Sequence, residues 1–175
     1  MEIRLLTAAD TEIYRAVRLR AVTEERTAFI TSAAEFQRQS REAIAARLRQ
    51  QEHSPEDFTL GAFVDGQLVG TVTFVRREAE KLRHKGDIYG MYVVPQARRQ
   101  GVGQALLTEA IQRALARPAL EQLLLTVVET QTAARQLYAS VGFVTYGREP
   151  RAVKVGDRYF DEELMILDLR KQGAK

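Results

Sequence analysis

Apolar residues change their spacing along the first third of the chain, and each spacing predicts a different element. Residues 3–6 form a short apolar and β-branched run, which predicts a strand. Residues 11–22 carry apolar side chains at roughly helical intervals after a polar stretch suited to helix capping, and residues 34–51 repeat this spacing. The chain is therefore predicted to begin with a strand and two amphipathic helices.

The middle of the chain predicts antiparallel strands. Residues 59–64 and 68–76 are short apolar or β-branched runs, and the turn-forming residues 65–67 separate them, which is typical of a hairpin. Residues 87–94 predict a third strand. It ends at Pro95, because proline cannot donate a hydrogen bond to a neighbouring strand.

The last part of the chain alternates helices with strands. Residues 101–116 predict a helix, 123–128 a strand and 132–141 another helix, and two final strands are expected near 143–146 and 164–169. A strand, a helix and a second strand in this order imply a right-handed crossover and at least one parallel pair. The pattern therefore predicts a mixed α/β fold.

Composition favours a single domain. The 175 residues are 45% hydrophobic and 28% charged, so we expect one domain over residues 1–170, followed by a short polar tail at 171–175. No apolar stretch approaches the roughly 18 residues needed to cross a bilayer, and the first residues lack the pattern of a signal peptide. A soluble, cytoplasmic protein without a membrane partner is expected.

Residue usage disfavours several kinds of chemistry. The sequence has no cysteine, and its two histidines, His53 and His84, lie in polar surroundings, so no metal is expected. The net charge is only +3, with the basic residues spread among 23 acids, so no nucleic-acid partner is expected. A basic cluster at residues 76–85 can attract an anion, although such runs are more often solvated loops.

The stretch at residues 92–104 carries the clearest chemistry: a strand end, a basic loop with glycines and a helix start. The first amides of a helix lack internal partners and favour negative charge. Gly101 and Gly103 would let the backbone approach a pyrophosphate, and Arg98 and Arg99 would add charged donors. Taken alone, the loop can equally be an ordinary helix start, and it is neither a P-loop nor a dinucleotide fingerprint.

Two motifs in this region resemble those of a known family. Residues 98–103 match the pattern Gln/Arg-x-x-Gly-x-Gly/Ala of the Gcn5-related N-acetyltransferases (GNAT), and the Ala-Leu-Leu of 105–107 follows it. After the strand at 123–128, residues 134–143 reproduce the family's segment A-x-x-L-Y-x-x-x-G-F. The resemblance covers roughly residues 1–170. It implies an α/β GNAT fold: a mixed, mostly antiparallel sheet splayed at a central parallel strand pair, with helices on both faces.

This resemblance implies an N-acetyltransferase that moves the acetyl group of acetyl-CoA to a primary amine by direct attack in a ternary complex. The strand at 87–94 would splay from that at 123–128, and backbone groups of Met91 and Val93 would bind the pantetheine arm in the opening. The amides of 99–104 would hold the pyrophosphate. The residues expected at the cofactor are Met91, Tyr92, Val93, Arg98, Arg99, Gln100, Gly101, Val102, Gly103, Gln104 and Gln131.

The resemblance also implies catalytic roles. Tyr138 takes the position of the general acid that protonates the departing thiolate, although it can equally be a packed helix tyrosine. The amine must lose a proton, and the candidate bases are Asp87 and Glu129, each of which can also be a solvent-facing acid. Thr126 occupies the base position of the ribosomal-protein branch and cannot serve. Gln131 replaces the usual asparagine beside the cofactor arm, which lengthens the reach of its amide.

The acceptor amine is expected to bind over the first two helices, their loop and the end of the sheet. There the segment 149–163 is expected to form a hairpin from which Tyr159 and Asp161 or Glu162 project; an acidic group there would pair with a cationic amine or simply form a solvated flank. A small-molecule amine is favoured because nothing marks a peptide groove, but a peptide or protein amine stays open. Exposed edge strands also allow a homodimer. The apolar and basic residues expected on this surface are Phe29, Phe36, Arg18 and Arg20.

Two readings from other classes remain. The chain can be a catalytically weak module that binds acetyl-CoA without efficient turnover, which the imperfect base positions and Gln131 permit. It can also be a nucleotide- or nucleic-acid-binding domain that uses the basic glycine loop, but this reading gives Leu137-Tyr138 and Gly142-Phe143 no role. Detectable hydrolysis or transfer with any amine would exclude the first, and a salt-insensitive affinity for coenzyme A with no retention of DNA would exclude the second.

Overall fold

The computed structural model describes residues 1–54 and 56–171. From residue 172 on, the predicted polar tail lies outside the described residues. In chain order, the elements are β1 (Glu2–Leu5), η1 (Ala8–Asp10), α1 (Thr11–Glu24), α2 (Ala33–Gln37), α3 (Arg41–His53), β2 (Asp57–Val64), β3 (Gln67–Arg76), η2 (Glu80–Leu82), β4 (Lys85–Val93), η3 (Pro95–Ala97), α4 (Val102–Leu115), β5 (Gln122–Val128), α5 (Thr132–Ser140), β6 (Val144–Val155), β7 (Arg158–Asp168) and η4 (Leu169–Lys171).

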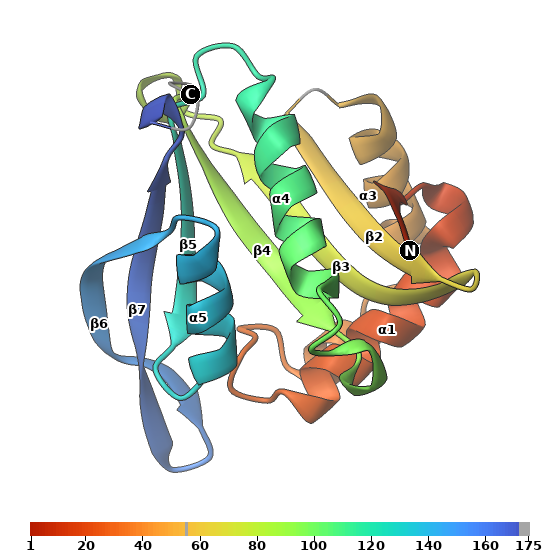
Figure 1. Cartoon of the computed structure of the whole chain (residues 1–175). Helices are drawn as coiled ribbons and strands as arrows, with labels where there is room; N and C mark the ends of the chain where they lie inside the picture. The colour runs from red at the N-terminus through yellow and green to blue at the C-terminus, as the bar shows by residue number, and fades with distance from the viewer. Residues whose placement is uncertain (55, 172–175) are drawn as a thin grey trace.

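The strands form one sheet in the order β1-β2-β3-β4-β5-β7-β6 (Figure 1). All neighbouring pairs are antiparallel except β4 and β5, which run parallel. These two strands pair only from Lys85 opposite Gln122 to Asp87 opposite Leu124, and they diverge beyond that point. The predicted mixed α/β sheet, splayed at a central parallel pair, is confirmed.

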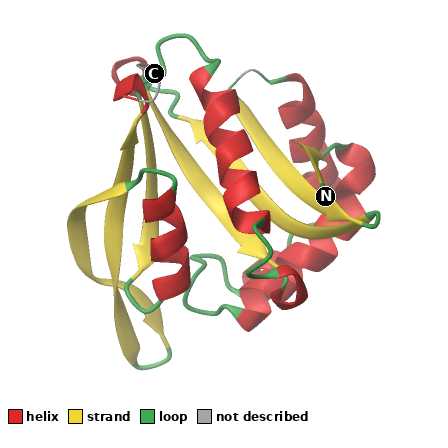
Figure 2. Cartoon of the chain, in the orientation of Figure 1, coloured by secondary structure: helices red, strands yellow, loops and turns green. Residues whose placement is uncertain are grey.

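Helices lie on both faces of the sheet, as expected (Figure 2). α4 and α5 lie on one face, and α1, α2 and α3 lie on the other over β1 to β4. The main core packs α4 against the sheet, where the buried rings of Phe58 and Phe74 stack with their centroids 5.1 Å apart. A smaller cluster that includes Ile44 and Leu48 lies under α1 and α3. Burial of such side chains stabilises each by about 1.5–3 kcal/mol.

The predicted helix at 34–51 is two helices, because local capping interrupts the apolar periodicity. α2 begins at Ser32, whose hydroxyl accepts a hydrogen bond from the amide of Glu35 at 3.2 Å. α3 begins at Ser40, whose hydroxyl accepts one from the amide of Ala43 at 3.1 Å. Each serine satisfies an amide that a new helix start would leave unpaired.

The last two strands are much longer than predicted. β6 and β7 form a hairpin in which Val155 pairs with Arg158 across a two-residue turn. Most side chains of β6 are exposed or half-exposed on both faces, so the strand lacks the alternation by which a half-buried strand is recognised. None of the described helices is long and apolar enough to span a membrane.

Candidate active site

A cradle of backbone amides forms where the loop after β4 enters α4. Arg99 and Gly101 have positive φ angles of 61° and 80°, which turn successive amides toward one side of the loop. The first helical hydrogen bond runs from the amide of Ala105 to the carbonyl of Gly101 at 3.0 Å. Among the described residues, no acceptor pairs with the amides of 99–104. This row of free donors at a helix start suits an anion such as pyrophosphate.

The polar side chains of this loop mostly form hydrogen bonds that hold the loop in place. The Arg98 guanidinium donates to the carbonyl of Val93 at 2.9 Å and to the carboxylate of Glu25 at 2.8 Å. The Gln100 amide donates to the carbonyl of Gln96 at 2.9 Å. Of the two predicted charged donors, Arg98 is thus already engaged, and backbone amides supply most of the cradle.

Gly103 allows α4 to approach β4 and α5. A Cβ at this position would lie 2.9 Å from Leu137 Cδ2 and 3.2 Å from Met91 Cε, closer than a side chain tolerates. Met91 and Val93 therefore point to the α4 face, where both lie near Gly103. The second glycine of the motif is needed for packing, whereas the first is needed for its backbone angle.

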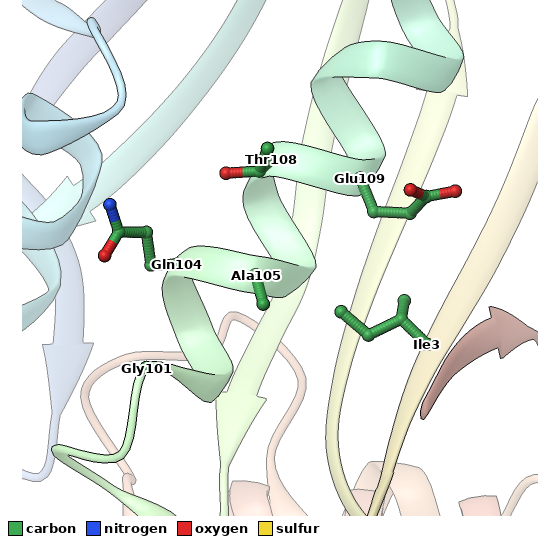
Figure 3. Close-up of a pocket in the computed structure, with 6 residues that line it drawn as sticks. All are labelled: Ile3, Gly101, Gln104, Ala105, Thr108 and Glu109. Carbon is green, nitrogen blue, oxygen red and sulfur yellow. The ribbon is translucent and has the colours of Figure 1, made fainter. Parts of the chain in front are cut away.

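A hollow of about 380 Å³ lies beside the first turns of α4 (Figure 3). In Figure 3, Gln104 points to the α5 side of the helix, whereas Ile3 and Glu109 lie on the opposite flank. Glu109 is paired with Arg113 at 2.7 Å. The hollow shares Gly101 and Gln104 with the amide cradle but does not lie between β4 and β5, so it forms an outer rim rather than the reaction centre.

The opening between β4 and β5 begins just after Asp87. Gly90 has a φ of 58° and forms a bulge in β4, because Thr71 pairs with Tyr92 but Thr73 pairs with Tyr89. The bulge places Met91 on the α4 face and Tyr92 on the α1 face. The β5-facing edge of β4 has no described strand partner beyond Asp87, so its backbone can receive an extended ligand.

Tyr92 and Glu24 link this strand to α1. The Tyr92 hydroxyl donates to the carboxylate of Glu24 at 2.6 Å. Burial, reinforced by this carboxylate, raises the pKa of Tyr92 to about 12. Neighbouring Glu25 contacts Arg98 and also accepts a bond of 3.5 Å from the Gln131 amide, so it joins the two sides of the opening. No motif signals either glutamate, and sequence reasoning missed both.

Tyr138 lies on α5 with its ring packed edge-on against Phe143, the centroids 6.1 Å apart. The residue is only 7% exposed, and no hydrogen bond of its hydroxyl is found among the described residues. Burial raises the pKa of Tyr138 to about 12, so the hydroxyl stays protonated at neutral pH. A protonated, unengaged hydroxyl is able to donate a proton to a leaving group.

The two predicted bases both lie in ion pairs. The Asp87 carboxylate accepts two hydrogen bonds of 2.8 Å from Arg77, and the Glu129 carboxylate accepts one of 2.7 Å from Arg148. Each carboxylate is therefore already engaged by an arginine side chain.

A third carboxylate, that of Glu162, lies beside the opening on the face opposite α4. Glu162 of β7 lies opposite Val128 of β5, and its carboxylate is close to the side chain of Thr126, also on β5. Burial, assisted by Glu149 on β6, raises the pKa of Glu162. The sequence suggested Glu162 only as a partner for a cationic amine. Its place beside Thr126 follows from strand register, which sequence spacing did not reveal.

Comparison with known proteins gives a consistent result. Residues 19–143 match the model of the acetyltransferase (GNAT) family. None of the curated proteins matches the chain. Among solved structures, a GNAT-family acetyltransferase from Streptococcus pneumoniae is 28% identical with a TM-score of 0.88, over 95% of this chain and 98% of that one.

Two further structures are similar. A ribosomal-protein-alanine N-acetyltransferase from Brucella melitensis is 27% identical with a TM-score of 0.83, over 96% of this chain and 99% of that one. The Salmonella typhimurium protein YncA, described as a putative acetyltransferase with its cofactor acetyl-CoA, is 20% identical with a TM-score of 0.83, over 97% of this chain and 94% of that one. The last similarity supports the fold alone.

Proposed function

Because the chain belongs to the GNAT family of acetyltransferases, we propose that it transfers the acetyl group of acetyl-CoA directly to the primary amine of a small molecule. The observation that carries this proposal is the row of free amides at 99–104, which lies beside the opening between β4 and β5. Both features suit one extended ligand with a pyrophosphate at one end and a thioester at the other.

The residues present fit this ligand. The amides of 99–104 would hold the pyrophosphate, and the free edge of β4 at Met91 to Val93 would bind the pantetheine arm as an added strand. Gly103 keeps α4 close enough to close one wall of the opening. Gln131 would reach the arm only by leaving Glu25, so its contact is the weakest part of the proposed site. The bound thioester supplies the activated acetyl group.

The proposed mechanism needs one base and one acid. The amine nitrogen forms a bond to the acetyl carbon, its proton passes to a base, the carbon–sulfur bond breaks, and the Tyr138 Oη proton goes to the departing thiolate. Glu162 is the better base, because no arginine or lysine in the described chain forms a salt bridge with it. Asp87 and Glu129 remain alternatives that would first have to release their arginine partners.

A second cavity supports a small acceptor. It has a volume of about 230 Å³ and lies between α1 to α3 and the strands β3 and β4, where Tyr89 and Gly90 line it. Pockets for drug-sized ligands measure about 300–1,000 Å³, so this one suits a smaller molecule. A peptide amine is the second candidate, which the similarity to the Brucella melitensis ribosomal-protein-alanine N-acetyltransferase favours.

Calorimetric titration with acetyl-CoA tests the proposed function. Wild type should bind, and Gly101→Asp should weaken binding at least about 100-fold, because a like charge beside pyrophosphate costs several kcal/mol. Gly66→Asp is the matched control. Gly66 has a similar φ of 76° and equally open surroundings, but it lies in the β2–β3 turn. A folded wild-type protein that does not bind acetyl-CoA would overturn the proposal.

Turnover is tested separately, with a panel of amines. Tyr138→Phe removes only the hydroxyl from a buried ring, so the fold should persist while kcat falls about 100-fold or more. Acetyl-CoA binding without transfer to any amine would instead identify a binding module.

A further inference from the structure

The cavity beneath α1 to α3 has an unbalanced charge. The described residues that line it include two arginines, Arg18 on α1 and Arg47 on α3, and no aspartate or glutamate. Its other polar groups include Thr31, Gln39 and Thr73, which are neutral. A cavity of this composition attracts an anion.

Arg18 is the central feature of this cavity. Its Nη1 atom is buried and has no hydrogen-bond partner among residues 1–54 and 56–171. The guanidinium carbon lies 4.3 Å from the centre of the Phe29 ring, which holds the group in place without satisfying its donors. Burial lowers the pKa of Arg18; nearby Tyr14 opposes this shift, and Arg47 adds to it. A buried charged donor without a hydrogen-bond partner is costly, so folding alone does not explain the position of Nη1.

The position of Arg18 relates the cavity to the reaction centre. A Cβ built on Gly90 would lie 3.9 Å from the Arg18 guanidinium carbon, so the guanidinium lies against the β4 bulge. Met91, the next residue, begins the edge proposed to hold the acetyl arm. Across the opening, on the same face of the sheet, Glu162 and Glu149 form a negative edge. The acceptor side is therefore positive at one end and negative at the other.

We propose that the acceptor is a small amino acid whose carboxylate binds Arg18 in this cavity while its amine lies at the opening between β4 and β5. This inference rests on the proposed function and names its substrate class. Arg18 and Arg47 bind the carboxylate, and the acidic edge attracts the ammonium form before it loses its proton to Glu162.

Matched acceptor pairs test this inference. Each of the twenty protein L-amino acids is compared with its α-carboxamide, which has nearly the same shape and lacks the negative charge. For at least one pair, wild type should show a kcat/KM about 10- to 100-fold higher for the carboxylate member, since a hydrogen bond to a charged group has this effect.

Substitutions of the arginines that line the cavity then test whether these residues cause the preference for the carboxylate acceptor. Arg18→Gln should bring the ratio of kcat/KM values within each pair close to one, while the affinity for acetyl-CoA stays unchanged. Arg49→Gln is the matched control, because Arg49 is exposed on α3 and does not line the cavity. The melting temperature of Arg18→Gln should be no lower than that of wild type, whereas a purely structural arginine would destabilise when removed. If Arg18→Gln fails to fold, Arg47→Gln at the exposed rim should still reduce the ratio severalfold.

Each outcome decides between the proposals. Three outcomes, each seen with a protein that binds acetyl-CoA, overturn the amino-acid inference and leave the cofactor proposal standing. They are equal rates within every pair, turnover of peptides alone, and no turnover of either member of any pair. If Arg18→Gln and Arg47→Gln both keep the preference for the carboxylate member of each pair, this cavity does not bind the carboxylate. Failure of folded wild type to bind acetyl-CoA overturns the proposed function itself.

Discussion

The two halves of the sheet differ in how completely helices cover them. The closed half, β1 to β4, has α4 on one face and α1 to α3 on the other, and its core contains Leu60, Phe74 and Leu106 with no exposed surface. The open half, β5 to β7, has α5 on one face, and no described helix lies over the other (Figure 1). That uncovered face carries Glu149 and Glu162. The closed half is thus suited to stability and the open half to chemistry.

Ion pairs follow the same division. In the closed half, the Asp10 carboxylate is 6% exposed and accepts bonds of 2.7 and 2.8 Å from Arg4. In the open half, Arg148 contacts both Glu129 and Asp161 on the surface, where solvent screens the charges. The same residue types therefore hold the fold together in one half and remain available for rearrangement in the other.

The largest effect on stability is expected in the closed half. Phe74→Ala removes a ring with no exposed surface that stacks on Phe58, so the free energy of unfolding should fall by about 3–5 kcal/mol. Tyr146→Ala is the control in the open half, because Tyr146 is 55% exposed, and it should change stability by less than about 0.5 kcal/mol. Urea unfolding followed by circular dichroism measures both. Equal losses of unfolding free energy in the two variants would show that the closed half does not contribute more to stability than the open half.

The largest effect on chemistry is expected in the open half. Glu162→Gln should lower kcat at neutral pH about 100-fold, because the amide cannot accept the amine proton. Activity of wild type should decline as pH falls through the raised pKa of Glu162, and the variant should lack this acidic limb. A raised folded-state pKa means that the charged group costs stability above that pH, so the variant should unfold no more easily than wild type. If the Glu162→Gln variant loses activity at low pH in the same way as wild type, Asp87 or Glu129 is the base instead.

The closed half was also the easier half to predict from sequence. Apolar alternation and the turn at Asp65-Gly66 give β2 and β3 almost to the residue, and both turn residues have the positive φ angles that this hairpin requires. The amide cradle was predictable for the same reason, because glycines at a helix start have a local physical meaning. β6 was largely missed, since its side chains do not alternate between buried and exposed positions.

The parts of the site that the sequence did not reveal depend on contacts between distant segments. Asp87 and Glu129 were sensible candidate bases by position, but whether a carboxylate is held by an arginine depends on how strands pack. Arg18 could be assigned to the acceptor surface, yet its unpartnered Nη1 is visible only in three dimensions. The spacing of residues in the sequence predicts sites built from local backbone amides well, but it predicts contacts between side chains of distant segments poorly.

The ion pair at the start of α1 should have a moderate effect on stability. Asp10→Asn weakens the bonds to Arg4 and to the Thr7 amide, so the free energy of unfolding at pH 7 should fall by about 1–2 kcal/mol. The Arg4 hydrogen bond holds the pKa of Asp10 below its usual value near 4, so this stabilisation is present above pH 4 and is lost as the pH falls through the lower folded-state pKa. Wild type and variant should therefore converge in acid. Asp161→Asn, in the open half, should cost less stability, because its bonds to Arg148 and to the Arg151 amide lie at the surface, where solvent screens them.

The smallest effect compares two hairpin turns of similar geometry. Gly66 in the closed half and Gly156 in the open half have φ angles of 76° and 61°, and neither would place a Cβ near other atoms. Alanine at either position carries the same local strain of about 1 kcal/mol. The turn at Gly66 adjoins buried Phe63 and Leu68, so Gly66→Ala should lower global stability by that amount.

The turn at Gly156 lies at an exposed hairpin tip, where Val155 pairs with Arg158. Local opening of the tip should therefore relieve the strain from Gly156→Ala. The free energy of global unfolding should fall by less than half as much as it does for Gly66→Ala. Amide hydrogen exchange separates the two cases, because only the Gly156 variant should exchange faster at Val155 and Arg158 while core amides stay protected. Equal global losses would show that the β6–β7 hairpin unfolds together with the closed half, and the division between a stabilising and a reactive half would then fail at its outermost point.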